Sequence, residues 1–175
     1  GAFFSKFYTA APVKLAYRGL GEISVWFSFG PMAILVAAVS QNVMLSREVL
    51  ILMPVSGLST LSILLVGQMI DVEADIAGGK HGVASRLGTG ATAALYVLAQ
   101  LGIIANVIGI FLVFPGPTRW FLPSLIPYIL IFPAACSVII RHHHKPDELK
   151  RAAKMTVLIH LLFSLLLIAG FAAYL

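Results

Sequence analysis

The sequence predicts an all-α membrane protein, a polytopic bundle of transmembrane helices. Hydrophobic residues make up 59% of its 175 residues and charged residues only 11%, and the mean hydropathy is +0.97. A soluble domain has about 45–50% apolar and about 25% charged residues. The apolar residues gather in long runs, and the alternating ten-residue segments typical of membrane β-barrels are absent from the sequence. The composition therefore excludes an ordinary soluble domain and a disordered chain.

Five apolar segments are long enough to cross a bilayer, whose core requires about 20 helical residues. They cover residues 20–40, 49–70, 91–114, 120–140 and 152–175. Backbone polar groups cannot be left unpaired in lipid, so each segment is predicted to be a helix. Kinks are expected where proline interrupts the backbone hydrogen bonds, at Pro31, Pro54, Pro123, Pro127 and Pro133.

The basic residues lie in the connections between these segments and predict the topology. Ten of the twelve lie in the N-terminal segment and in the second and fourth connections, whereas Arg47 and Arg119 lie in the other two. The positive-inside rule then places the ten in the cytoplasm and the C-terminus on the opposite side, in a plasma or inner membrane. Trp120 is expected to be an interfacial anchor. With the basic residues in this position, no nucleic-acid partner is expected.

The most informative stretch is the end of the second segment and the connection after it, residues 67–88. Asp71 and Asp75 are four residues apart, so their carboxylates share a face if the helix continues through them. A divalent cation would relieve their repulsion, and Mg²⁺ is commonly held by one or two carboxylates together with substrate phosphates. Lys80 and Arg86 could contact the same phosphates. The alternative is that these charges only anchor the helix ends at the headgroup region.

Two blocks of this sequence resemble the UbiA superfamily of intramembrane prenyltransferases. The first matches the family's second aspartate motif: Asp71, Asp75, Gly79-Lys80 and Ala84-Ser85-Arg86-Leu87-Gly88. The second block consists of Tyr8-Thr9-Ala10-Ala11-Pro12, then Lys14-Leu15-Ala16-Tyr17-Arg18-Gly19-Leu20-Gly21-Glu22, then Phe29-Gly30-Pro31. The second block is similar to the branch that prenylates dihydroxynaphthoate in menaquinone synthesis.

The resemblance implies a nine-helix fold of which this chain supplies the last five helices. The family's first aspartate motif, of Asn-Asp-x-x-Asp type, is absent from this sequence and belongs to the earlier helices. Residues 1–175 are therefore expected to be one transmembrane domain, the C-terminal portion of such an enzyme. Its partners would be the lipid bilayer and the missing N-terminal helices or another chain that carries the first motif.

The resemblance also implies a reaction and a set of site residues. Asp71 and Asp75 would be the catalytic metal ligands, holding Mg²⁺ against the diphosphate of a polyprenyl donor, and an aromatic ring would be the acceptor. Lys80 and Arg86 would hold the diphosphate. The other expected substrate-binding residues, each of which could instead be an interfacial anchor or a helix-packing residue, are Lys14, Tyr17, Arg18 and Gln68.

The sequence departs from the branch pattern just before the first aspartate. An Asn pair and an Arg are usual there, and this sequence has Gly67-Gln68 and Ile70. Hydroxybenzoate, homogentisate, a chlorin or a prenylated glycerol phosphate therefore stay open as acceptors. A second class of function stays open as well, a non-catalytic truncated paralogue that binds isoprenoid lipids. A channel or transporter is less expected, because four spans carry no acidic residue and no inverted repeat is evident.

Several other polar residues have structural interpretations. Glu22 is expected to pair with Arg18, one helical turn away, at the membrane edge. His160 is expected to pack or hydrogen-bond between helices, and the small residues of the segment 56–60 are expected to allow close helix packing. His81 could be a weak diphosphate contact. His142, His143 and His144 could in principle ligate zinc, but a solvated cytoplasmic loop is favoured because consecutive side chains on a helix diverge.

Overall fold

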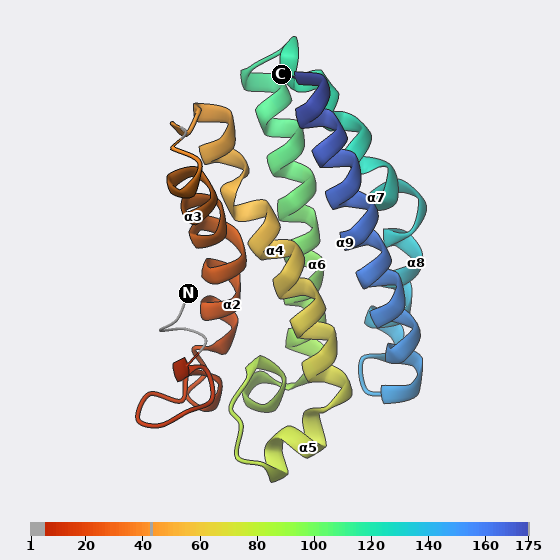
Figure 1. The fold of residues 1–175 in the computed structure, drawn as a ribbon. Coiled ribbons are helices and arrows are strands. Elements are labelled where there is room, and N and C mark those ends of the chain that lie inside the picture. Colours follow the sequence, from red (N-terminus) through yellow and green to blue (C-terminus); the bar gives the residue numbers. More distant parts are fainter. Residues whose placement is uncertain (1–5, 43, 175) are drawn as a thin grey trace.

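The computed structural model describes residues 6–42 and 44–174, and all regular structure in them is helical. The long helices run side by side in one bundle, with the α3–α4 connection and the C-terminus at one end (Figure 1). The elements, in chain order, are η1 (Leu15–Tyr17), α2 (Gly21–Phe27), η2 (Ser28–Met32), α3 (Ala33–Ser40), α4 (Arg47–Ile70), α5 (Val72–Ala77), α6 (Val83–Val113), η3 (Pro117–Leu125), α7 (Ile126–Leu130), α8 (Phe132–His142) and α9 (Pro146–Tyr174).

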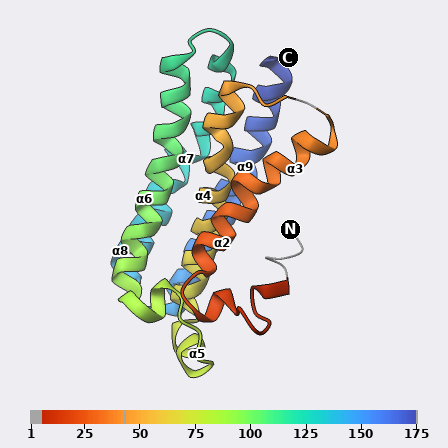
Figure 2. The ribbon, with the colours of Figure 1, turned by 90° about the vertical axis from the view of Figure 1, so that its left-hand side faces the viewer.

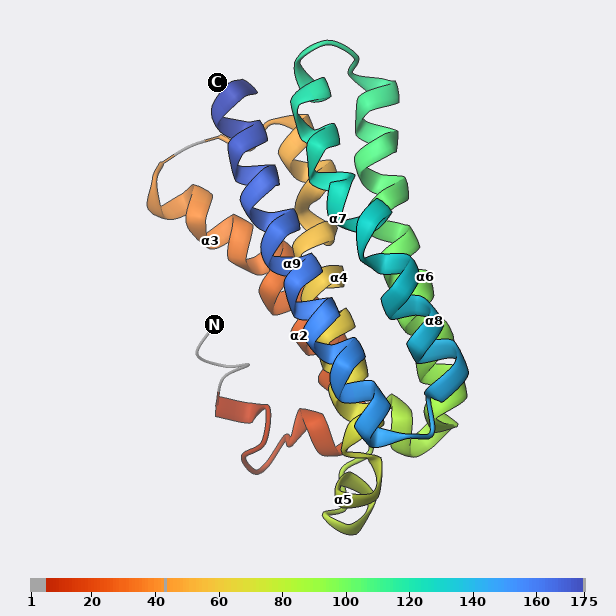
Figure 3. The same ribbon diagram turned by 90° about the vertical axis from the view of Figure 1, so that its right-hand side faces the viewer.

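The predicted membrane spans are confirmed within the described residues. Four helices are long and apolar enough to cross a membrane: Gly21–Ser40, Arg47–Ile70, Val83–Val113 and Pro146–Ala173. A bent pair of helices supplies a fifth. The N-terminal segment, the α4–α6 connection with α5, and the α8–α9 turn all lie at the end opposite the C-terminus (Figures 1 and 3). These are the three most basic connections, so the structure gathers the charge asymmetry of the sequence at one end.

Two predicted helix starts were wrong, because apolar length alone does not show where a helix begins. The third span starts at Val83 rather than at residue 91, and Gly88 interrupts it with φ 84° and ψ 163°. The positive φ is readily adopted by glycine, which has no Cβ. The last span starts at Pro146 rather than at residue 152. Its first turn contains Pro146, Asp147 and Glu148, which are favoured at a helix N-terminus.

The fourth predicted span is not one continuous helix. It consists of the 3₁₀ helix η3, the short helix α7 and then α8, with a bend of 42° between residues 118–130 and 132–142. Pro123 lies inside the 3₁₀ helix, and Pro133 lies in the first turn of α8, directly after the bend. Because proline has no N–H to donate, a helix restarts more readily at these positions than it continues. The expectation of a kink is confirmed for this span.

The bundle core is built on one face of α6. Tyr96, Ile103, Val107 and Ile110 have no exposed surface, and their spacings of seven, four and three residues place them on one stripe of the helix. This stripe belongs to a single core shared with α4, α8 and α9. The opposite faces of the long helices carry exposed Leu, Ile and Val side chains, as expected for helices that contact lipid.

The first span crosses α4 (Figure 2), and glycines of the two helices lie in close contact. A Cβ on Gly30 would lie 3.0 Å from the Met53 carbonyl oxygen and 3.1 Å from the Gly57 Cα, so the two backbones touch. Pro31 lies in the π-helical turn η2, and the Phe29 carbonyl oxygen of the same turn accepts a hydrogen bond from the Ser56 hydroxyl of α4 at 2.8 Å. These contacts confirm close packing at residues 56–60.

His160 forms a hydrogen bond between two helices, as expected. Its Nδ1 lies 2.7 Å from the Ser59 Oγ, which joins α9 to α4. Ser59→Ala should lower the free energy of unfolding by about 1 kcal/mol, the usual size of an interhelical hydrogen bond in a membrane. Thr60→Ala is the matched control, since the Thr60 hydroxyl bonds only to the Ser56 carbonyl of its own helix. Equal losses in the two variants, measured by denaturant titration in micelles, would contradict an interhelical role.

Candidate functional site

The end of α4 and the loop after it place the two aspartates. Helix α4 ends at Ile70, and Asp71 has φ −97° and ψ 12°, so it joins α4 to the short helix α5. The Asp75 amide donates to the Asp71 carbonyl oxygen at 2.8 Å, which keeps the two residues one turn apart across the junction. Asp71 is exposed, and the Asp75 side chain retains 17% of its surface. Both carboxylates therefore stay within reach of a ligand.

Asp75 and Lys80 form an ion pair in this loop. The Lys80 Nζ lies 2.8 Å from the Asp75 Oδ1, and the Lys80 amide donates to the Asp75 carbonyl oxygen. The hydrogen bond and charge of Asp75 raise the pKa of Lys80, and nearby Tyr17 and Asp71 act in the same direction. Lys80 is thus cationic at neutral pH. The four predicted site residues Asp71, Asp75, Lys80 and Tyr17 lie close enough to influence one another electrostatically.

A pocket of about 110 Å³ lies between this loop and the N-terminal segment. Asp75, Lys80 and Gln68 line it together with Tyr8 and Glu22. Burial raises the pKa of the Tyr8 hydroxyl, and the negative charge of Glu22 adds to this effect. Tyr8 therefore faces the pocket as a neutral hydrogen-bonding group. The structure brings together chain segments that are far apart in the sequence.

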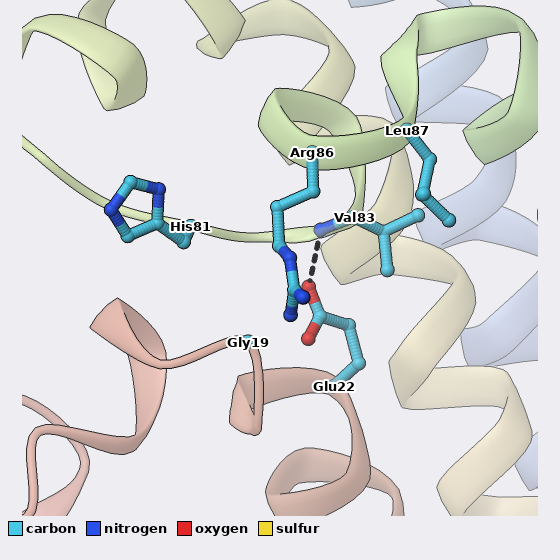
Figure 4. Close-up of a pocket in the computed structure, with 6 residues that line it drawn as sticks. All are labelled: Gly19, Glu22, His81, Val83, Arg86 and Leu87. Atoms are coloured by element: carbon cyan, nitrogen blue, oxygen red, sulfur yellow. Dashed lines mark hydrogen bonds between the residues drawn. The ribbon is translucent and has the colours of Figure 1, made fainter.

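Arg86 lies in a second pocket, of about 210 Å³, and Glu22 lines both pockets. The other lining residues of the second pocket are Gly19, His81, Val83 and Leu87. The Arg86 side chain extends from α6 toward Gly19 and Glu22, whereas the His81 ring points away from Glu22 (Figure 4). Any Cβ on Gly19 would overlap the Arg86 guanidinium, and Gly19 has a φ of 72°. Because Gly19 has no side chain, the Arg86 guanidinium can occupy this space.

Three further predicted site residues lie at the same end but make local contacts. The Lys14 Nζ lies over the Tyr17 ring, 5.6 Å from its centroid. The Arg18 guanidinium donates to the Pro12 carbonyl oxygen at 3.1 Å. The predicted Arg18–Glu22 ion pair is wrong, because Glu22 instead accepts hydrogen bonds from Gln68 and from the backbone of Val83. The four-residue spacing does not place Arg18 and Glu22 on one helix face, because Arg18 precedes the start of α2 at Gly21.

Sequence reasoning underestimated Glu22 and did not select Tyr8 as a site residue. The sequence signal for Glu22 as a functional residue was a carboxylate at the membrane edge, directly after Gly-Leu-Gly. Its hydrogen-bond partners could not be predicted, because they lie on two other helices. The three consecutive histidines lie at the end of α8. His143 Nδ1 is 3.0 Å from the Thr89 hydroxyl, and its ring stacks edge-on against His144.

The oxygen ligands at this end fit a magnesium ion that is shared with a phosphate. Mg²⁺ is usually bound by one or two carboxylates plus phosphate oxygens and waters, and Asp71 and Asp75 are accessible carboxylates of this kind. Within residues 6–42 and 44–174, no group of three or more His, Cys, Asp or Glu side chains could hold a metal ion.

The fold defines an integral membrane protein of several helical spans. A pocket lined by charged residues lies at the end of the bundle that carries Asp71 and Asp75. The family model "UbiA prenyltransferase family" matches residues 1–166. The chain belongs to the UbiA prenyltransferase family, as the sequence motifs predicted.

Named relatives agree with this family. The chain is 29% identical to a 2-carboxy-1,4-naphthoquinone phytyltransferase of Synechocystis, over 97% of this chain and 54% of that protein. The chloroplastic enzyme of the same name from Arabidopsis thaliana is 29% identical over 93% and 44% of the two chains. A 1,4-dihydroxy-2-naphthoate octaprenyltransferase of Mycobacterium tuberculosis is 30% identical over 58% and 35%. The chain thus spans about half the length or less of these relatives. No solved structure matches it significantly.

Proposed function

We propose that this chain takes part in transferring a polyprenyl group from a polyprenyl diphosphate to an aromatic acceptor. The observation that carries the proposal is the gathering of Asp75, Lys80 and Gln68 around one pocket, with Asp71 beside it, where the spans meet the surface. An isoprenoid tail can enter such a site from the lipid, and a diphosphate can enter from water. A pocket that combines carboxylates with a lysine suits a diphosphate bound together with a divalent cation.

The basic residues of the site hold the leaving group. Lys80 and Arg86 would donate to the diphosphate oxygens, with Lys80 exchanging its Asp75 contact for the phosphate. Lys14, Tyr17 and Arg18, at the same end, would orient donor and acceptor. The allylic carbon–oxygen bond breaks and both electrons leave with the diphosphate. An acceptor ring carbon then bonds to the allylic carbon and the ring loses a proton. The apolar helix faces keep water from the cationic carbon.

Asp71 and Asp75 would hold Mg²⁺ in this site. When bound, the ion supplies charge stabilisation for the departing diphosphate without proton transfer. The carboxylates would also bring the diphosphate close to Lys80, because Asp75 and Lys80 are adjacent in the site. The substitution that tests this role opens the Discussion.

A naphthoate-type acceptor is the one we propose, because three relatives carry naphthoate or naphthoquinone names. Hydroxybenzoate, homogentisate, a chlorin and a glycerol phosphate lipid are the alternatives. We propose further that residues 1–175 form the C-terminal portion of a nine-helix enzyme and that other helices supply the first aspartate motif. The site faces the cytoplasm, since ten of twelve basic residues lie in the connections of that end or in the adjoining helix ends.

Transfer assays on membranes that contain the full-length protein test the proposal. Each of the five acceptor classes is supplied with a radiolabelled polyprenyl diphosphate, with Mg²⁺ or with excess chelator. We expect prenylated product with dihydroxynaphthoate, and none with chelator. Product with another acceptor alone would overturn the naphthoate assignment. Isoprenoid binding without product from any acceptor would favour the non-catalytic alternative.

A further inference from the structure

Glu22 is a buried carboxylate that joins three helices. It is the second residue of α2, and only 8% of its surface is exposed. Its Oε1 accepts a hydrogen bond from the Gln68 Nε2 of α4 at 2.7 Å and another from the Val83 amide of α6 at 2.8 Å. The second of these bonds is drawn in Figure 4. We call Glu22, Gln68 and the Val83 amide the Glu22 clasp.

The clasp replaces a cap that α6 lacks. The residue before Val83 is Gly82, which has no side chain to accept a hydrogen bond, and the first turn of α6 contains no acidic residue. The first amides of a helix need an acceptor from outside, and a negative charge there is favourable. Glu22 provides both from a helix that is 61 residues away in sequence.

The clasp also fixes the Gln68 amide. A carboxylate oxygen only accepts, so the NH₂ group of Gln68 must face Glu22. The Gln68 Oε1 is buried and has no hydrogen-bond partner among the described residues. A Cβ at Gly82 would lie 2.7 Å from the Gln68 Nε2, so glycine leaves the space that this amide fills. The orientation of the Gln68 amide is therefore set by its hydrogen bond to Glu22.

Along the chain, the Val83 amide of the clasp lies between the two cations expected to hold the diphosphate. Lys80 comes three residues before Val83, and Arg86 comes three residues after it. The Ser85 hydroxyl lies 3.0 Å from both the Lys80 and the Gly82 carbonyl oxygens and shares its one hydrogen between them, which ties this turn to the start of α6. A displacement of Val83 would consequently move Lys80 and Arg86 together.

We infer that Glu22 is a positioning residue, which holds the start of α6 against α2 and α4 and thereby sets the places of Lys80 and Arg86 for a diphosphate group. This inference rests on the proposed function for its ligand. The Glu22 clasp itself does not depend on that function, so it has a separate readout.

A reciprocal exchange of Glu22 and Gln68 in the full-length protein tests the inference. Gln68→Glu alone places two carboxylates opposite each other. The double variant E22Q/Q68E restores an amide that faces a carboxylate. In the double variant, the new amide oxygen at position 22 can still accept a hydrogen bond from the Val83 amide. Hydrogen exchange of residues 78–90, measured without substrate, reports the clasp. Binding of inorganic diphosphate with Mg²⁺ reports the positioning. Ser24→Ala is the matched control, because that buried α2 hydroxyl bonds only to the Leu20 carbonyl.

We expect Q68E to speed exchange over residues 78–90 and to weaken diphosphate binding about tenfold, the usual effect of one lost charge-assisted hydrogen bond. The double variant should recover most of both losses, and S24A should resemble the wild type. Unchanged exchange in Q68E, or no recovery in the double variant, overturns the inference. A wild-type protein that binds no diphosphate contradicts the proposed function, and the exchange data still decide whether the clasp exists.

Discussion

Asp75→Asn in the full-length protein is expected to reduce prenyl transfer by more than about a hundredfold, because a metal-binding carboxylate contributes several kcal/mol of charge stabilisation. The side chain keeps its size, so the loss would come from charge. The same change removes the main cause that raises the pKa of Lys80. The measurement is single-turnover transfer over a range of Mg²⁺ concentrations. Asp71→Asn should behave in the same way.

Asp147→Asn provides the matched control for this prediction. Asp147 also pairs with a lysine at 2.8 Å, at the same end of the bundle, but it lies on α9 and its side chain is 94% exposed. Loss of an exposed ion pair costs about 0–1 kcal/mol, so its transfer rate should stay close to that of the wild type. Near-normal turnover of the Asp75 variant would remove Asp75 from the mechanism.

Gly57→Ala is expected to destabilise the bundle by about 3 kcal/mol, at the upper end of overpacking costs. Any Cβ at this position would overlap the carbonyl oxygen of Trp26 and approach its ring. The obstacle is backbone, so no side-chain rotation can relieve it, and the first span would have to move away from α4. Denaturant titration in micelles measures the free energy of unfolding, and cross-linking of the first span to α4 reports their separation.

Gly67→Ala in the same helix separates packing from helix propensity. Apart from the nearby backbone of its own helix and its two chain neighbours, no atom of the described residues would lie within 4 Å of a Cβ at Gly67, and alanine is intrinsically more favourable than glycine in a helix by about 1 kcal/mol. This variant should be as stable as the wild type or slightly more stable. If the two alanine variants lost equal stability, the tight contact between the first span and α4 would not exist.

The Glu22 clasp and the Gly57 contact share a consequence for how the site is held. Both fasten the first span to α4, one at the charged end and the other inside the bundle. The loop that carries Lys80 is therefore held by the first span as well as by the helices that flank it. We expect variants in either contact to disturb the site even though neither contact includes Asp71 or Asp75.

The sequence by itself determined the class of protein, the spans and the aspartate motif. Long apolar runs are local properties, and lipid leaves a chain no alternative to helices with internally paired backbones. The position of Asp71 and Asp75 at the end of a span, with Lys80 and Arg86 nearby, could likewise be read along the chain, because it depends on spacing over a few residues. Successive spans cross the membrane in opposite directions, so every second connection lies on the same side. The gathering of the basic connections at one end could be predicted from this alternation.

Only the tertiary structure decided which partner each polar residue has. Arg18 is close to Glu22 in sequence but bonds to Pro12, and Glu22 bonds to residues 46 and 61 positions away. The start of α6 at Val83 also depends on a contact between helices, because the Val83 amide donates to Glu22 of α2. Hydropathy records how much apolar surface a segment has and not which neighbour covers it. A buried carboxylate needs specific donors, and only the folded chain brings the donors of α4 and α6 to the carboxylate of α2.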